Sequence, residues 1–287
     1  MSDVTANLPL DAPDRYAVVG NPIRHSKSPQ IHTAFAEQCG QHMVYRSQLI
    51  EVGHFAASAR AFFESGGCGL NVTVPFKLDA FDFADELSGR ARRAGAVNTL
   101  ARQDDGSIYG DNTDGIGLVR DLHDNLGWEI GERRVLLLGA GGAVRGILEP
   151  LLRRHPASVV IANRTVDKAV ELATAFADLG VTIEGCGFDA LCEREFDLVI
   201  NGTSASLAGE LPPLPDGLLS DNGCCYDMMY GAQPTPFMRW AAGQMAWAVA
   251  DGLGMLVEQA AESFCIWRGV RPETRCVIEQ LRAALSH

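Results

Sequence analysis

The sequence lacks an uninterrupted apolar run of the roughly 20 residues that a bilayer-spanning helix needs. It also lacks an early basic-then-apolar order, so no secretory signal is expected from Met1 to Arg15. The eight cysteines show no Cys-x-x-Cys or cysteine–histidine spacing, which predicts reduced thiols in a cytoplasmic protein without a zinc site or disulfide framework. Positive charge is in deficit: the formal net charge of −12 argues against nucleic acid and anionic membranes as partners.

Among what is present, alternating strand and helix patterns run along the whole chain. The 287 residues suffice for two domains of ordinary size, and 47% hydrophobic with 21% charged residues is typical of a soluble globular protein. Such alternation predicts an α/β fold with mostly parallel sheets. Strands are expected at 16–19, 43–49, 68–74, 97–102, 107–110, 135–138, 159–162, 181–183, 197–200 and 224–227, and helices at 28–39, 52–64, from 114, 143–154, 252–267 and 272–285.

The most informative segment is a glycine-rich turn that follows the strand at 135–138. A strand that passes through such a turn into a helix is how many domains bind a pyrophosphate. A plain glycine turn stays the alternative, because Val144 occupies the third glycine position of the usual pattern. The ordered strand, turn, helix and second strand favour nucleotide binding. The turn residues are Gly139, Ala140, Gly141, Gly142 and Ala143.

The end of the second strand predicts which nucleotide is bound. A carboxylate there would accept a hydrogen bond from a free ribose 2′-hydroxyl. This chain has Arg164 instead, with Lys168 one turn further on, and both suit a 2′-phosphate. The prediction is therefore NADP rather than NAD. Because the net charge is −12, an anionic cofactor also requires local positive charge, for which the candidates are Arg164, Lys168, Lys77, Lys27 and Arg24.

Three polar segments are candidates for the chemistry. In 71–77, alternation puts Asn71 and Thr73 on one side of a strand, and Lys77 falls in the first turn of a helix, where a positive charge opposes the helix dipole. A simple surface lysine is the alternative. Ser26 and Ser28 precede a helix and can converge on an anion, although Ser28 could serve only as a helix cap.

The third segment, 110–115, is polar and contains Asp114, which could be no more than a helix cap. His25 is interpreted as either structural or close to the bound anion. Together the three segments provide what a dehydrogenase for a polyhydroxylated carboxylate would need. A lysine and an aspartate would handle the proton, while amides, hydroxyls and the serine pair would hold the substrate.

A series of motifs, in order from about Tyr16 to the C-terminus, resembles those of the shikimate dehydrogenase family. They are His25-Ser26-Lys27-Ser28-Pro29, Asn71 to Lys77, Gly95-Ala96-Val97-Asn98-Thr99, Asn112-Thr113-Asp114-Gly115, Gly139 to Ala143, Asn163-Arg164-Thr165, Asp227-Met228-Met229-Tyr230 and Asp251 to Ala260. The resemblance implies a substrate domain at residues 1–114, completed by helices at 252–287, and a Rossmann-type NADP-binding domain at 115–251, with a cleft between them.

The resemblance also implies a role for each matching residue in the NADP-dependent interconversion of 3-dehydroshikimate and shikimate, a step of aromatic amino acid biosynthesis. Lys77 and Asp114 would be the catalytic pair, assisting direct hydride transfer without a metal. Ser26 and Ser28 would bind the substrate carboxylate, and Asn71, Thr73, Asn98, Tyr230 and Gln259 would surround the substrate ring. The turn 139–143 would hold the pyrophosphate, Asn163, Arg164, Thr165 and Lys168 the 2′-phosphate, and Met228 and Gly252 the nicotinamide end.

Three positions depart from the family pattern: Thr33, Gly202 and Ser206. They bear on the shape of the loop on the nicotinamide side. Three other functions stay as alternatives, namely a dual quinate/shikimate dehydrogenase that accepts NAD, a non-catalytic NADP-binding module, and a folate-linked dehydrogenase. The presence of Lys77 and Asp114 argues against the second, and the serine pair argues against the third. A monomer and a homodimer are both compatible with the sequence.

Overall fold

The N-terminal part of the chain forms a six-stranded mixed sheet. The computed structural model describes residues 12–203, 205 and 209–285. The strands are β1 (Asp14–Gly20), β2 (Met43–Leu49), β3 (Gly67–Val72), β4 (Glu86–Leu87), β5 (Thr99–Arg102) and β6 (Ile108–Asp111). Their order across the sheet is β2-β1-β3-β5-β6-β4. The first three strands run parallel, and β5 pairs antiparallel with both β3 and β6, so the strands predicted at 97–102 and 107–110 form a hairpin.

Helices connect these strands and bury their apolar sides against the sheet. They are α1 (Ser28–Gln38), α2 (Phe55–Glu64), α3 (Lys77–Phe83) and α4 (Gly89–Ala94). Phenylalanines of α2 and of the segment before α3 pack with the valines and leucines of β1, β3 and β5 in one buried cluster. The predicted alternation holds at the end of β3, since Val72 enters this core while Asn71 faces the other way. It was wrong for Val74, which was expected in the core as well but lies beyond the end of β3 and is exposed.

The second sheet is fully parallel. Its strands are β7 (Arg134–Leu138), β8 (Ser158–Ala162), β9 (Thr182–Cys186), β10 (Phe196–Asn201), β11 (Leu219–Asp227) and β12 (Ala248–Asp251), in the order β12-β11-β10-β7-β8-β9. Helices α6 (Gly142–Leu152), α7 (Val166–Ala175) and α8 (Pro236–Gly243) cover it. Residues 135–138 are all fully buried, because a parallel sheet is covered on both faces and needs continuous apolar strands. The predicted α/β architecture with mostly parallel sheets is confirmed.

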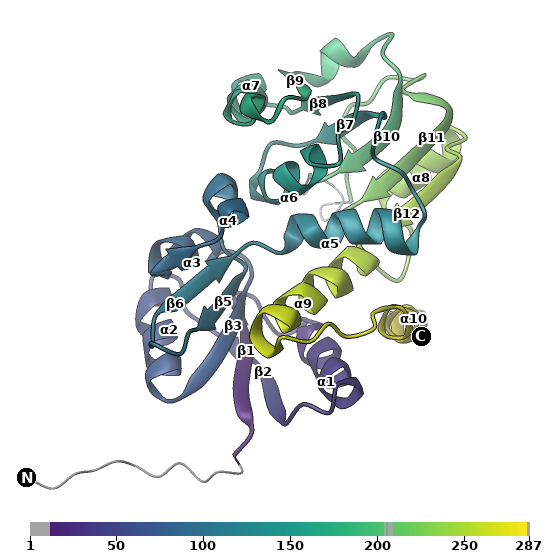
Figure 1. Cartoon of the computed structure of the whole chain (residues 1–287). Helices are drawn as coiled ribbons and strands as arrows, with labels where there is room; N and C mark the ends of the chain where they lie inside the picture. Colours follow the sequence, from purple (N-terminus) through teal and green to yellow (C-terminus); the bar gives the residue numbers. More distant parts are fainter. Residues whose placement is uncertain (1–11, 204, 206–208, 286–287) are drawn as a thin grey trace, which may run out of the picture.

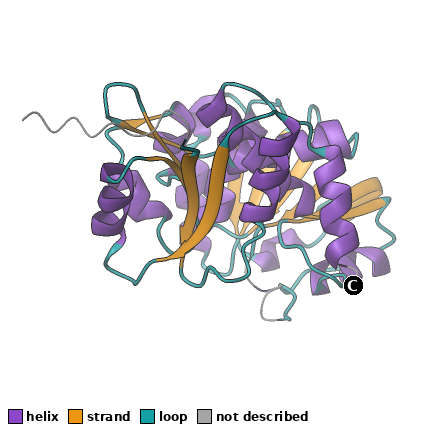
Figure 2. Ribbon diagram, turned by 90° about the horizontal axis from the view of Figure 1, so that it is seen from below, coloured by secondary structure: helices purple, strands orange, loops and turns teal. Residues whose placement is uncertain are grey.

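Two helices lie side by side between the sheets (Figure 1). One is α5 (Asp114–Arg120), which continues as a π-helical turn at Asp121–Asn125, and the other is α9 (Leu253–Arg268). The C-terminal part of the chain thereby returns to the first sheet: α9 and α10 (Arg275–Leu285) share a buried apolar cluster with α1. Trp267 of α9 also donates a hydrogen bond to the carbonyl of Leu100 in β5 at 3.0 Å. Figure 2 shows the two sheets and their helices from below.

The structure corrects two predicted caps. Lys27, rather than Ser28, is the residue that precedes α1, and Ser28 is its first helical residue. Thr113 likewise precedes α5, so Asp114 is inside the helix and its carboxylate is free for other partners. The elements β4, α4, α7, α8 and β12 were absent from the prediction. Within the part of the chain that the structure describes, no helix has both the length and the apolarity to span a membrane.

Candidate active site

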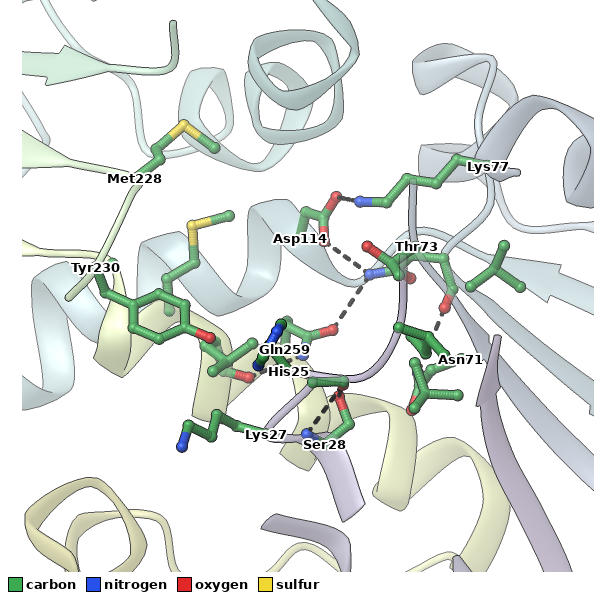
Figure 3. A pocket seen from close by; sticks show the side chains of 18 of the residues that line it. His25, Lys27, Ser28, Asn71, Thr73, Lys77, Asp114, Met228, Tyr230 and Gln259 are labelled. Carbon is green, nitrogen blue, oxygen red and sulfur yellow. Dashed lines mark hydrogen bonds and ion pairs between the residues drawn. The ribbon is translucent and has the colours of Figure 1, made fainter. Parts of the chain in front are cut away.

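A cavity of about 390 Å³ opens between the two sheets, and it gathers side chains from both (Figure 3). Its walls come from the segment before α1, the end of β3, the starts of α3 and α5, the segment after β11 and one face of α9. All of the residues predicted for catalysis and substrate binding line it. They are Ser26, Ser28, Asn71, Thr73, Lys77, Asn98, Asp114, Tyr230 and Gln259, and Met228 and Gly252 join them.

Lys77 and Asp114 form an ion pair inside this cavity. The Lys77 ammonium nitrogen lies 2.5 Å from Asp114 Oδ2, and the two side chains are 29% and 12% exposed. Lys77 is the first residue of α3 and Asp114 the first of α5, so each side chain extends from the start of a helix. The pair thus presents a proton donor with a fixed acidic partner to whatever occupies the cavity.

Asn98 fixes the other oxygen of that carboxylate. Its amide nitrogen donates to Asp114 Oδ1 at 2.8 Å and to Gln259 Oε1 at 3.3 Å. Its amide oxygen accepts from the backbone N–H of Thr113 at 2.9 Å. Asn98 therefore connects the catalytic candidate on α5 to the side chain of Gln259 on α9.

Asn71 is held by a second set of hydrogen bonds at the bottom of the cavity. Tyr45 of β2 donates its hydroxyl to Asn71 Oδ1 at 2.7 Å. The Asn71 amide nitrogen donates to Ser263 Oγ of α9 at 3.0 Å and to Thr99 Oγ1 at 3.3 Å. Asn71 is 6% exposed, so only a small part of its amide reaches the cavity.

The two serines lie together at the start of α1. Ser26 Oγ accepts a hydrogen bond from the Ser28 backbone N–H at 3.3 Å, and the two hydroxyl oxygens are 3.2 Å apart. Lys27 and His25 line the same side of the cavity (Figure 3). This corner combines two hydroxyls, a lysine and helical N–H groups, a combination suited to a carboxylate.

The glycine-rich turn has the backbone conformation that its sequence predicts. Gly139 has φ +103°, a value in the region that favours glycine. A Cβ atom added at Gly141 or Gly142 would meet nothing within 4 Å, so the backbone here is open to an approaching group. Since α6 begins at Gly142, its first N–H groups face that open space.

Arg164 follows β8, the strand next to β7, and Lys168 lies in the first turn of α7. Strands β7 and β8 are neighbours, and the Gly139 N–H donates to the Ala162 carbonyl at 2.8 Å, which brings the segment after β8 next to the turn. Asn163 Nδ2 donates to the Thr165 carbonyl at 2.8 Å and shapes this segment. Among the described residues, neither Arg164 nor Lys168 is in an ion pair, and both are exposed. Two cations without ion-pair partners, in the segment that follows the strand next to the glycine turn, fit a phosphorylated dinucleotide.

Three family models match the chain. They are the shikimate dehydrogenase substrate-binding domain at residues 18–100, the shikimate/quinate 5-dehydrogenase model at 121–208 and the shikimate 5′-dehydrogenase C-terminal domain at 252–282. A shikimate dehydrogenase (NADP⁺) of Cellvibrio japonicus is 63% identical over 95% of this chain and 98% of its own length. The chain belongs to the shikimate dehydrogenase family.

Solved structures with the same fold are similar to this chain. The Ael1 enzyme from Pseudomonas putida is 49% identical, with a TM-score of 0.87 over 93% of this chain and 98% of the other. Shikimate 5-dehydrogenase from Thermus thermophilus, in complex with NADP(H) and shikimate, is 31% identical, with a TM-score of 0.83 over 95% of this chain and 100% of the other.

Two of the three departures from the family pattern, Thr33 and Gly202, lie among the described residues. Thr33 is exposed on α1 and lines a separate surface groove rather than the cavity. A Cβ atom at Gly202 would lie 2.5 Å from Val144 and 3.1 Å from Met228 Sδ, so glycine leaves room for the methionine of the cavity wall. Ser206 lies outside the described residues.

Several residues around the site were given no role in the sequence analysis, although Thr113, Met255 and Leu256 stand within motifs that it named. Tyr45, Ser263 and Thr113 belong to the hydrogen-bond networks beneath the cavity, and Met255 and Leu256 line its wall. Tyr45 resembles any other aromatic residue of a strand, and Ser263 lies within the pattern of a helix. No local signal distinguishes either from an ordinary core residue, because their partners lie far away along the chain.

Proposed function

We propose that this member of the family catalyses the NADP-dependent interconversion of 3-dehydroshikimate and shikimate. The observation that carries the proposal is the Lys77–Asp114 ion pair, at 2.5 Å, inside a cavity that also contains the Ser26–Ser28 corner. A proton donor and an anion-binding corner within one cavity suit a substrate that has both a reacting oxygen and a carboxylate. The name of the Cellvibrio japonicus relative and the ligands of the Thermus thermophilus structure support the same reaction.

Each wall of the cavity has a proposed role in holding the substrate. Ser26 and Ser28 bind the carboxylate with their hydroxyls, at the start of α1. The substrate ring then lies toward Asn71, Thr73, Asn98, Tyr230 and Gln259, whose polar groups suit ring hydroxyls. This arrangement directs the C3 oxygen of the substrate toward the ion pair.

Lys77 is proposed to hold the proton that is exchanged with the C3 oxygen. A lysine ammonium has three N–H donors, of which one is used by Asp114, so others are available to a substrate oxygen. Asp114 keeps the ammonium in place, and Asn98 keeps Asp114 in place through its second carboxylate oxygen. In the reducing direction Lys77 donates to the developing alkoxide, and in the oxidising direction it accepts the hydroxyl proton, with Asp114 as its partner.

NADP is the proposed cofactor: its reduced form would supply the hydride for reduction, and its oxidised form would accept the hydride from shikimate. The backbone of 139–143 fits the pyrophosphate because it is open and precedes α6. Asn163, Arg164, Thr165 and Lys168 are proposed to bind the 2′-phosphate, and Met228 and Gly252 to border the nicotinamide. The proposed division of labour is then residues 1–114 with 252–287 for the substrate and 115–251 for the cofactor.

A panel of substrates and cofactors tests the proposal. Purified protein is mixed with shikimate or quinate and with NADP or NAD, and formation of the reduced nicotinamide is followed by its near-ultraviolet absorbance. The expected result is rapid turnover with shikimate and NADP alone. Preferred turnover of quinate or of NAD would replace the proposal with the dual dehydrogenase, and no turnover with any combination would refute it.

A further inference from the structure

Tyr45 lies under the cavity and touches Asn71, one of the proposed substrate ligands. It is 8% exposed, and its ring stacks on the His32 ring with centroids 4.2 Å apart and planes 10° apart. Its hydroxyl is 2.7 Å from Asn71 Oδ1. The ring is thus held by packing while its one polar atom reaches toward the site.

The direction of this hydrogen bond follows from the partners of the amide. Asn71 Nδ2 lies 3.3 Å from the backbone carbonyl of Asn98, and a carbonyl can only accept. The atom that faces this carbonyl must therefore be the nitrogen, so the atom that faces Tyr45 is the oxygen. Tyr45 must then donate, which leaves a second lone pair on Asn71 Oδ1 for another donor.

From Asn71 the hydrogen bonds continue to the catalytic candidates. The amide nitrogen donates to Thr99 Oγ1 at 3.3 Å, and Thr99 donates to Asn98 Oδ1 at 2.9 Å. Asn98 in turn donates to Asp114 Oδ1 at 2.8 Å. In this series of hydrogen bonds each residue donates to the next one, from Tyr45 to Asp114. The order is fixed because the Asn98 carbonyl and the Asp114 carboxylate can only accept.

Ser263 of α9 holds the same amide from the other side. It is fully buried, accepts from Asn71 Nδ2 at 3.0 Å and donates to the Gln259 carbonyl at 3.1 Å. Tyr45 and Ser263 therefore fix opposite ends of one amide from two distant parts of the chain.

We infer that Tyr45 and Ser263 are positioning residues, which act through Asn71 to present its amide oxygen to a ring hydroxyl of the substrate. The inference rests on the proposed function, since it assigns Asn71 to the substrate. Loss of either hydroxyl leaves Asn71 in the cavity but removes one of the hydrogen bonds that fix the orientation of its amide. The cost appears in substrate binding rather than in the chemical step, because neither hydroxyl touches Lys77.

The test is Tyr45→Phe, with Tyr16→Phe as a matched control. Tyr16 is the register partner of Tyr45 on β1, is 4% exposed and packs on Trp267, but its hydroxyl accepts from Arg268 instead of reaching Asn71. For Tyr45→Phe we expect KM for shikimate to rise about 3- to 10-fold, as for one lost hydrogen bond, with kcat and KM for NADP unchanged. Tyr16→Phe should leave KM for shikimate unchanged.

A double-mutant cycle decides whether Tyr45 acts through Asn71. In an Asn71→Ala background, Tyr45→Phe should change kcat/KM no further, because the amide that it orients is gone. Ser263 of α9 contacts the same amide, so Ser263→Ala should raise KM for shikimate in the same way. This second variant provides the test if Tyr45→Phe folds poorly. The inference would be overturned if Tyr16→Phe raised KM for shikimate as much as Tyr45→Phe does. It would also be overturned if Tyr45→Phe kept its full effect in the Asn71→Ala background, or if neither Tyr45→Phe nor Ser263→Ala changed KM. Failure of the wild-type protein to oxidise shikimate would instead refute the proposed function.

Discussion

Replacement of Lys77 by alanine tests the proposed acid–base role most directly. The substitution removes the ammonium that lies 2.5 Å from Asp114, while the Asn98 hydrogen bond to the other carboxylate oxygen stays. General acid–base assistance is worth about 10²–10⁴ in rate, so kcat should fall by that factor with little change in KM. This corresponds to roughly 3–5 kcal/mol in the activation barrier.

The same substitution should hardly affect folding. The Lys77 side chain is 29% exposed, and ion pairs that reach solvent contribute about 0–1 kcal/mol. We therefore expect the thermal midpoint to fall by about 4 °C or less, even though kcat falls by orders of magnitude. This separation of activity from stability is what a chemical role predicts.

Lys27→Ala is the matched control for charge. Lys27 lines the same cavity, and among the described residues it has no ion-pair partner. It should change KM for shikimate and leave kcat within about threefold of wild type. Steady-state kinetics and thermal denaturation of all three proteins provide the comparison. Near-normal turnover of Lys77→Ala, or an equal loss of kcat in Lys27→Ala, would refute the reasoning.

Three further variants test the cofactor site, the cavity wall and the core. Arg164→Ala should raise KM for NADPH about 10- to 100-fold, as for a lost charged hydrogen bond, and leave NADH use unchanged; equal losses would contradict the phosphate assignment. Gly252→Ala should destabilise the protein by about 1–3 kcal/mol in thermal denaturation, because its Cβ would lie 2.2 Å from the Met228 carbonyl oxygen, whereas Gly243→Ala has open space and should be neutral. Burial lowers the pKa of His32 to about 3, so the unfolded state binds the proton first as pH falls. The free energy of unfolding should therefore decrease as the pH falls below about 6.5. His32→Phe should abolish a loss of about 2 kcal/mol between pH 7 and pH 5 in urea denaturation, and an unchanged pH slope would show that the histidine is not buried in its neutral form.

The parts of the site that depend on local conformation follow from the sequence. The turn at 139–143 requires glycine because Gly139 has φ +103°, and the apolar strand before it is buried on both faces. A helical turn at Lys77 is expected because Pro75 cannot continue a strand, although β3 already ends at Val72. Steric rules that act over a few residues decide such features.

The caps and the short elements were harder to predict. Ser28 has the residue type of a cap, yet the helix begins at Ser28 itself, because Lys27 already has helical backbone angles. The strand β12 was missed because it is an edge strand of four residues, and its place beside β11 depends on the rest of the sheet. Helix boundaries of this kind depend on tertiary packing more than on local preference.

By itself, the sequence determined the strand–helix alternation, the glycine turn with its neighbouring cations and the types of polar residue available for chemistry, because sterics and side-chain chemistry act locally. Only the tertiary structure decided which of these groups meet. Asn71 and Ser263 are 192 positions apart and share a hydrogen bond, and Lys77 and Asp114 are 37 positions apart and form an ion pair. Such contacts form when α9 packs between the two sheets and removes apolar surface from water. Because the hydrophobic effect is not directional, only the complete fold decides which polar groups become partners.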